Sequence, residues 1–220
     1  MADHTGPPNT LFRWAVGAAL LGLLVIYQSV DDSPVQPPAT AAAAPVAAPA
    51  PSAPAARQKA KASPTLPRSR PTRLRVPQLF LDAPFTELGL APGGTLEAPS
   101  ADDKNLVGWY RGGAAPGERG SAVVAGHVDT RTGPAVFLML HLLTPGSTVD
   151  ITREDGITAT FVVDSTQTYP KNAFPDAKVY GDTEDAQLRL ITCGGAYDKK
   201  LKDYTDNVVV FAHLQSSRTD

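Results

Sequence analysis

The sequence contains a single cysteine, Cys193, and its setting indicates a chemical role. It ends an alternating apolar run, 188–193, and is followed directly by Gly194 and Gly195. A β-strand here would carry the thiol to the edge of a sheet, and the two glycines would let the backbone of a ligand approach closely. A lone cysteine is more often a small buried apolar residue than a catalyst. The assignment of a nucleophile therefore depends on the rest of the chain.

A second reactive side chain follows another predicted strand. His127 stands in the glycine-flanked segment 126–130, directly after the short apolar stretch 121–125. The strands of a small barrel can bring such ends together although they are far apart in sequence. A thiol and an imidazole suffice for acyl transfer, because a thiolate attacks a carbonyl and an imidazolium protonates the leaving amine. His141 and His213 lack flanking glycines, and we interpret both as structural.

The elements that must position these side chains are mainly strands. The stretches with strand patterns are 74–81, 121–125, 148–152, 157–163, 188–192 and 207–212. A turn at 154–156 predicts a hairpin between the third and fourth of these, and the best helix candidate is 135–143. Many short strands separated by turns indicate an antiparallel sandwich or a closed barrel, and periodicity does not choose between the two.

An apolar stretch near the amino terminus predicts a membrane anchor. Residues 11–30 approach the length of about 20 residues that spans a bilayer. No small-residue cleavage site follows closely, which favours an uncleaved anchor over a cleaved signal peptide. Arg13 precedes the apolar core and acids follow it, so residues 1–10 are expected in the cytoplasm and the remainder outside. In an oxidising exterior a single cysteine is either an intermolecular bridge or a thiol kept for its chemistry.

Residues 31–71 are predicted to form a disordered stalk. The segment Ser33–Pro64 has 21 alanines and prolines among its 32 residues, which leaves too little apolar surface to offset the entropy of ordering. Its prolines favour extended geometry, at roughly 3 Å per residue. The chain is basic from Arg57 to Arg75, with no acid in between. We interpret this run as a solvated linker, with contact to anionic lipid or wall polymer as the alternative.

Residues 72–215 are long enough for one domain with its own core, and 216–220 form a short tail. From Val76 onward there are 12 Lys and Arg against 19 Asp and Glu, so the chain would repel phosphate and nucleic acid is not an expected partner. The sequence has no Cys/His cluster at zinc spacing and no glycine-rich phosphate loop, so we expect no metal and no cofactor. The acids at 182–185 leave calcium as an alternative to a solvated loop.

Four motifs, in this order, resemble those of the sortases, the cysteine transpeptidases of Gram-positive cell surfaces. They are GHVDT at 126–130, GPAVF at 133–137, LITCGGAYD at 190–198 and YTDNVVVFA at 204–212. Their form is similar to that of the actinobacterial group called class F. The similarity extends from about Arg73 to Leu214.

The resemblance implies an all-β fold: an eight-stranded β-barrel of the sortase type with one or two short helices, preceded by the transmembrane helix and the stalk. It also implies that Cys193 forms a thioacyl-enzyme with a C-terminal sorting-signal peptide and that His127 acts as acid and base. The implied partners are surface proteins that bear the sorting signal and an amine acceptor, on the cell wall or on a pilin-like subunit. The catalytic domain would then be extracellular on a single-pass protein of the cell membrane.

The sequence departs from the family in one respect. Sortases generally carry an arginine shortly after the cysteine, where it holds the substrate and stabilises the oxyanion. The stretch 196–212 contains no arginine, and Thr205 occupies the position where one is expected. Lys202 is the first candidate for a replacement, and Arg131, in the loop after His127, is the second. Lysine would supply charge without the planar fork of a guanidinium.

Two alternatives to a sortase remain open at this level. One is a wall-crosslinking transpeptidase of the other cysteine type, whose histidine and serine before a glycine-cysteine pair are missing at 190–193. The other is a catalytically silent β-barrel that binds a surface peptide or a partner protein, which the missing arginine favours. A thiol-reactive probe distinguishes an enzyme from a silent barrel, because a nucleophile labels faster than an inert buried thiol.

Overall fold

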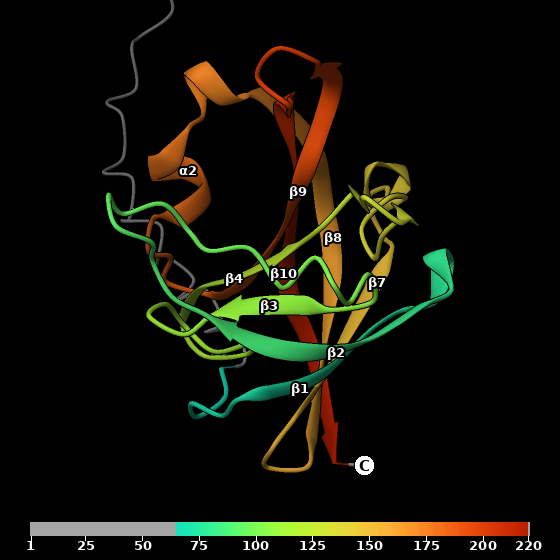
Figure 1. The fold of residues 1–220 in the computed structure, drawn as a ribbon. Coiled ribbons are helices and arrows are strands. Elements are labelled where there is room, and N and C mark those ends of the chain that lie inside the picture. The colour runs from blue at the N-terminus through green and yellow to red at the C-terminus, as the bar shows by residue number, and fades with distance from the viewer. Residues whose placement is uncertain (1–64, 220) are drawn as a thin grey trace, which may run out of the picture. The chain divides into compact units, whose positions relative to one another are not determined.

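The computed structural model describes residues 65–219, and eight of its strands close into a barrel (Figure 1). Around the barrel the order is β1-β2-β3-β4-β9-β10-β8-β7. The strands are β1 (Pro71–Val76), β2 (Leu81–Leu88), β3 (Val107–Tyr110), β4 (Gly120–Gly126), β7 (Thr148–Arg153), β8 (Ile157–Pro170), β9 (Ala186–Asp198) and β10 (Asp203–Thr219). Two further short strands, β5 (Asp129–Thr130) and β6 (Gly133–Pro134), pair with each other. Of the two all-β architectures that the strand patterns left open, the structure has the closed barrel, and the eight strands that the family resemblance implied are confirmed.

Helical structure is limited to short segments. These are the α-helix α2 (Asp176–Tyr180) and the 3-10 turns η1 (Pro77–Leu79), η2 (Leu140–Leu142) and η3 (Lys171–Ala173). The helix expected over 135–143 is wrong, since only η2 forms there. Phe137, Leu140 and Leu143 are buried at intervals of three residues, and the backbone bonds join residues three apart, as in a 3-10 turn.

Two of the strand pairings are parallel, which the antiparallel expectation missed. β2 pairs with β3 in parallel, and β4 pairs with β9 in parallel from Gly120–Ala186 to Ala125–Ile191. Parallel neighbours end at the same edge of a sheet. β4 ends at Gly126, one residue before His127, and β9 carries Cys193. The parallel pairing therefore directs both reactive positions to one end of the barrel.

The core fills the barrel, and a smaller cluster packs α2 on its outside. The largest fully buried apolar side chains of the interior include Phe137, Phe161, Leu74, Leu140, Ile151, Leu188 and Leu190. The second cluster consists of Val123, Val179, Ile191, Val209 and Phe211. β9 is buried on both faces from Leu188 to Thr192, although its sequence alternates, because Arg189 and Thr192 are buried together with the apolar residues.

The residues before β1 lie against the barrel. The Leu66 amide donates to the Gly117 carbonyl at 2.7 Å. Arg68 donates to the carbonyl of Gly113 at 2.9 Å, and its guanidinium lies 5.2 Å from the ring centre of Trp109. Residues 65–70, which the sequence analysis counted with the stalk, are thus held by the domain. The rest of the stalk and the expected anchor at 11–30 fall outside the described residues.

No helix within residues 65–219 is long and apolar enough to cross a membrane.

Arg153, at the end of β7, holds this first segment from inside the protein. Its side chain is fully buried and donates to the carbonyls of Pro116 at 2.8 Å and Pro67 at 2.7 Å. The nitrogen that bonds Pro67, Nη2, also lies 2.5 Å from Oδ2 of Asp155 in the β7–β8 turn, and Nε donates to Oδ1 of the same carboxylate at 3.2 Å. One buried guanidinium therefore joins the segment before β1, the loop before β4 and the turn after β7.

Candidate active site

Cys193 lies where β9 leaves the core. β9 is buried from Leu188 to Thr192, and Cys193 is the first half-buried residue after that run. On one side its register partner is Asn207 of β10. The thiol is therefore held by a strand that is fixed in the core and is still open to a ligand.

The two glycines after Cys193 are required by the neighbouring strand. Gly195 has φ 75°, and a Cβ there would lie 2.2 Å from Oδ2 of Asp206 and 2.6 Å from Oγ1 of Thr205. A Cβ at Gly194 would lie 2.8 Å from a methyl group of Val208. The sequence alone indicates that these glycines admit the backbone of a ligand. The structure adds a different reason, the close approach of β10 at its bulge.

His127 follows β4 and is held on two sides. Its carbonyl accepts a hydrogen bond from the Phe137 amide at 2.9 Å, and its Nε2 lies 2.8 Å from the carbonyl oxygen of Pro99. A carbonyl oxygen only accepts, so we assign the proton of the neutral ring to Nε2 and leave Nδ1 as the acceptor. The β4–β9 register stops at Ala125–Ile191. Extended by two residues, it would set position 127 beside position 193.

A hydrogen bond fastens the His127 loop to β10. The Tyr204 hydroxyl donates to Oδ2 of Asp129 at 2.5 Å. This bond, together with partial burial and the negative charge of Asp129, raises the pKa of Tyr204 to about 12. Asp129 lies two residues after His127, and Tyr204 follows Asp203 at the start of β10. The bond therefore limits how far the histidine loop can move from the strand that flanks Cys193.

A lysine that the sequence analysis did not consider contacts the thiol. Nζ of Lys171 lies 3.6 Å from Sγ of Cys193 and 2.7 Å from each carboxylate oxygen of Asp203. The hydrogen bond from Lys171 lowers the pKa of Asp203. Lys171 follows β8, which is separated from β9 by β10 in the barrel order, so no spacing in the sequence pointed to this contact.

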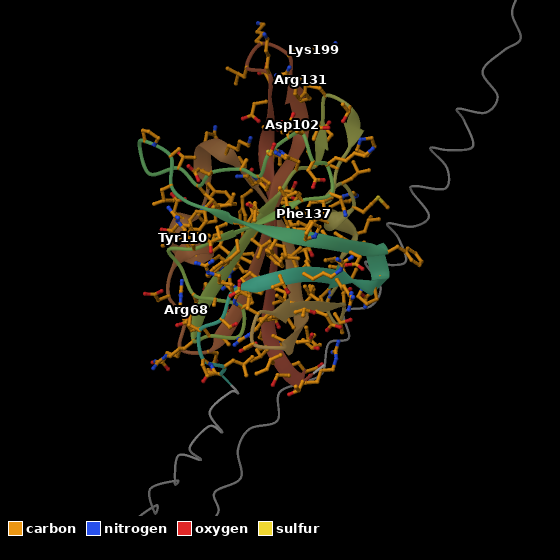
Figure 2. All side chains as sticks on the ribbon, turned by 60° about the horizontal axis from the view of Figure 1, so that its bottom comes forward. Arg68, Asp102, Tyr110, Arg131, Phe137 and Lys199 are labelled. Atoms are coloured by element: carbon orange, nitrogen blue, oxygen red, sulfur yellow. The ribbon has the colours of Figure 1, made fainter. Side chains whose placement is uncertain are left out.

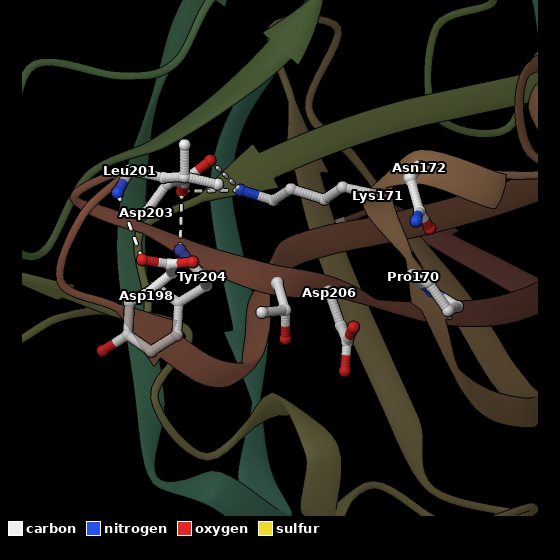
Figure 3. Close-up of a pocket in the computed structure, with 9 residues that line it drawn as sticks. Pro170, Lys171, Asn172, Asp198, Leu201, Asp203, Tyr204 and Asp206 are labelled. Atoms are coloured by element: carbon white, nitrogen blue, oxygen red, sulfur yellow. Dashed lines mark hydrogen bonds and ion pairs between the residues drawn. The ribbon is translucent and has the colours of Figure 1, made fainter.

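A pocket of about 370 Å³ opens beside this contact (Figure 3). Figure 3 shows Lys171 reaching toward Asp203 across the pocket. Thr205, the residue at the expected arginine position, also lines the pocket, and its hydroxyl accepts from the Ala196 amide at 3.2 Å. The full lining consists of Pro170, Lys171, Asn172, Asp198, Leu201, Asp203, Tyr204, Thr205 and Asp206.

The two cations proposed from the sequence lie in exposed turns. Lys202 is in the β9–β10 turn with φ 53°, and Arg131 is in the β5–β6 turn. Figure 2 shows Arg131 and the β9–β10 turn, marked by Lys199, at the same end of the barrel. Neither Lys202 nor Arg131 belongs to the pocket lining. Both stay candidates for the role of the missing arginine.

The other two histidines of the described domain are exposed. His141 Nδ1 lies 3.2 Å from the Leu138 carbonyl, and His213 Nδ1 lies 2.7 Å from a carboxylate oxygen of Asp164. Along β10, His213 is six residues beyond Asn207, the register partner of Cys193, which is roughly 20 Å. His213 is therefore a suitable control for His127.

A family model described as the sortase domain matches residues 74–215, which is more than half of the chain. The chain belongs to the sortase family. Sortase A of Listeria monocytogenes is similar in structure, with a TM-score of 0.52 at 18% identity over 70% of this chain and 92% of that chain. A lid mutant of Corynebacterium diphtheriae sortase A gives 0.52 at 18% identity, over 69% and 73% of the two chains. Sortase C-1 of Actinomyces oris gives 0.50 at 18% identity, over 66% and 73%.

A search of curated proteins found no match to this chain. At 18% identity the solved structures support the fold alone, and sortases A and C match almost equally, so the fold does not select a class. Sortases are cysteine transpeptidases of the cell wall, and this chain contains one cysteine. The protein is accordingly a sortase-type cysteine transpeptidase.

Proposed function

We propose that this sortase is a membrane-anchored transpeptidase of the class F type, with Cys193 as nucleophile and His127 as acid and base. It cleaves a C-terminal sorting signal and transfers the acyl part to an amine on the cell surface. The observation that carries the proposal is the parallel pairing of β4 with β9, which directs the two side chains to one end of the barrel. The class assignment depends on the four sequence motifs around these residues.

In the first half of the reaction, the Cys193 thiolate attacks the carbonyl carbon of the scissile peptide bond. The carbon–sulfur bond forms, and the carbonyl oxygen takes the negative charge. When the intermediate collapses, the carbon–nitrogen bond breaks and His127, as imidazolium, gives its proton to the leaving amine. The product is a thioester on Cys193 and a neutral histidine.

In the second half, an amine of the acceptor attacks the thioester carbon. His127 takes the proton from the attacking nitrogen, the new amide bond forms, and the carbon–sulfur bond breaks to return the thiolate. The ring nitrogen proposed for both transfers is Nδ1, because Nε2 is held by the Pro99 carbonyl. The Tyr204–Asp129 bond supports this step by limiting the position of the histidine loop.

The proposed cellular setting comes from the amino-terminal third of the sequence. Residues 11–30 would anchor the protein in the membrane, and the Ala/Pro-rich stalk would carry residues 72–215 outside the cell. The proposed partners are surface proteins that bear the sorting signal and an amine of the cell wall or of a pilin-like subunit. No cofactor is required by this chemistry.

Intact-mass analysis of the full-length protein in detergent tests the proposal. The protein is incubated with a peptide library that carries candidate sorting motifs, with and without an added amine. We expect an acyl adduct on the wild type, no adduct on Cys193→Ala, and release of the adduct by the amine as a new amide. A wild type that binds peptides but never forms the adduct would instead support the catalytically silent barrel.

A further inference from the structure

The structure assigns to Lys171 the role of the active-site cation of this enzyme, held in place by Asp203. The inference rests on the proposed role of Cys193 as nucleophile and adds a second catalytic residue beside it. It starts from one contact: Nζ of Lys171 lies 3.6 Å from Sγ of Cys193, while the Lys171 side chain is 29% exposed.

Strand register explains how Lys171 reaches the thiol from another part of the sequence. Gly194 is opposite Asp206 on β10, and Asp206 is opposite Pro170 on β8. Lys171 is the next residue after Pro170 and begins η3, where the chain turns out of the sheet. The neighbouring strands β9, β10 and β8 therefore place the thiol, the pocket wall and the ammonium, respectively, at the same height along the barrel.

Asp203 holds the Lys171 ammonium in place and leaves one of its three N–H groups for the sulfur. Both carboxylate oxygens lie 2.7 Å from Nζ of Lys171. An ammonium has three N–H groups, so two can bond to the carboxylate and one remains for the sulfur. The ion pair also offsets the rotamer entropy that a long lysine side chain loses when it is held in one position.

The third donor is placed to act at two stages of the reaction. Before the attack, a cation next to the sulfur stabilises the thiolate relative to the thiol. During the attack the negative charge moves from the sulfur to the carbonyl oxygen, which is bonded to the carbon that the sulfur attacks. An ammonium in contact with Sγ can donate to that oxygen and stabilise the charge. Thr205, in contrast, is uncharged and its hydroxyl already accepts from the Ala196 amide.

A charge-sensitive alkylation experiment tests the contact without any need for a peptide substrate. The full-length protein in detergent is treated with iodoacetate, which is an anion, and with neutral iodoacetamide, and the ratio of the two rate constants at Cys193 is measured. We expect Lys171→Met to lower this ratio by about threefold or more, and Lys171→Arg to retain it. Added salt should reduce the difference between wild type and Lys171→Met.

The matched control is Lys178→Met. The ammonium of Lys178 also donates to a polar side chain, the Tyr169 hydroxyl at 2.8 Å, and Lys178 lies on α2 beside Phe211. Its replacement should leave the iodoacetate-to-iodoacetamide ratio unchanged. Circular dichroism and thermal melting establish that each variant folds. A ratio that falls in Lys202→Met or Arg131→Met, and is unchanged in Lys171→Met, would overturn the assignment.

Kinetics on an acyl-transfer substrate test the catalytic role. Lys171→Met should lower kcat by about 10²-fold with little change in KM, and Lys171→Arg should recover part of this loss. A full kcat in Lys171→Met would overturn the role. If the wild type forms no acyl-enzyme but its alkylation ratio still depends on Lys171, the contact stands and the transpeptidase proposal fails, so the two failures are distinguishable.

Discussion

Cys193 is the first partly exposed residue after the buried stretch Leu188–Thr192 of β9, which makes its replacement a clean chemical test. Cys193→Ala should abolish acyl-enzyme formation and peptide cleavage, because no other thiol is present in the sequence. The fold should persist, since the loss of one half-buried sulfur leaves little cavity. Intact mass and thermal melting measure the two effects. Retention of a substantial part of the wild-type rate would show that another group is the nucleophile.

The histidine assignment is tested by a comparison within the chain. His127→Ala should lower the rate of acyl transfer by about 10²-fold or more, because proton transfer to the leaving amine loses its donor. His213→Ala is the control, since His213 lies on the same barrel roughly 20 Å along β10 from the level of Cys193. Rates are compared after correction for the folded fraction. Equal losses in both variants would contradict a special role for His127.

Asp203 should behave as a positioning residue rather than as a passive surface acid. Asp203→Asn removes the carboxylate that holds Lys171, so kcat should fall because the ammonium is no longer held in position. The iodoacetate-to-iodoacetamide ratio should rise, because a negative charge that repels iodoacetate is lost. A fall in kcat together with a rise in the labelling ratio would identify an electrostatic role for Asp203.

The Asp203–Lys171 ion pair has a defined pH range. The pKa of Asp203 is lowered by Lys171, so the ion pair contributes fully above the ordinary value near 4 and is lost only as pH falls through the lower folded value. The effect of the variant on labelling should therefore be constant from about pH 5 to 8.

At the scale of elements, the bond between Tyr204 and Asp129 joins β10 to the loop that follows β4. Tyr204→Phe removes this bond and keeps the ring, so kcat should fall by about three- to tenfold, while stability changes by about 1 kcal/mol. Stopped-flow acylation and urea unfolding give the two values. An unchanged kcat would mean that the histidine loop is held sufficiently by the Pro99 contact.

The same bond has a defined pH range. The folded pKa of Tyr204 is raised to about 12, above its unfolded value near 10. A raised pKa gives stability that is complete below pH 10 and is lost as the pH rises through about 12. The ratio of wild-type to Tyr204→Phe rates is therefore constant from pH 6 to 9.

The sequence predicted most strands and one hairpin, but not the other strand pairings. Strand patterns marked segments within β4, β7, β8, β9 and β10, and the turn at 154–156 predicted the β7–β8 hairpin, which is confirmed. Periodicity reports which face of a strand is buried and says nothing about its neighbour, so the parallel β4–β9 pair was missed. The helix over 135–143 failed for a related reason, because apolar spacing of three and of four residues look alike in so short a stretch.

The residues of the candidate site were likewise predicted only in part from the sequence. Cys193 and His127 were predicted because each follows a strand and stands next to glycine. Lys171 was missed because its partner is 22 residues away on a strand that is not adjacent to its own. Its sequence carries no motif, only a lysine after proline. Such a contact becomes visible once the strand order is known.

At the scale of the whole domain, Arg153 is the largest fully buried side chain among residues 65–219 and connects three separate segments. Asp155→Asn leaves its buried charge without a carboxylate, so the free energy of unfolding should fall by about 2 kcal/mol at pH 7. Arg153 lowers the pKa of Asp155, so this contribution is present above pH 4 and is lost as pH falls through the lower folded value. Urea unfolding at pH 7 and at pH 3 measures it. An equal loss at both pH values would contradict the ion-pair explanation.

The place where the chain joins the barrel has a mechanical consequence. Residues 65–70 are fastened beside the β7–β8 turn, and the pocket lies at the other end of β8, which runs the length of the barrel in Figure 1. Over the span Ile157–Pro170 this is a separation of roughly 40 Å. A pull transmitted through the preceding chain would load the bonds of Leu66 and Arg153 before any group around Cys193. The segment 65–70 and the pocket beside Cys193 therefore lie at opposite ends of the domain, and under the proposed membrane anchoring a pull on the chain would reach the first before the second.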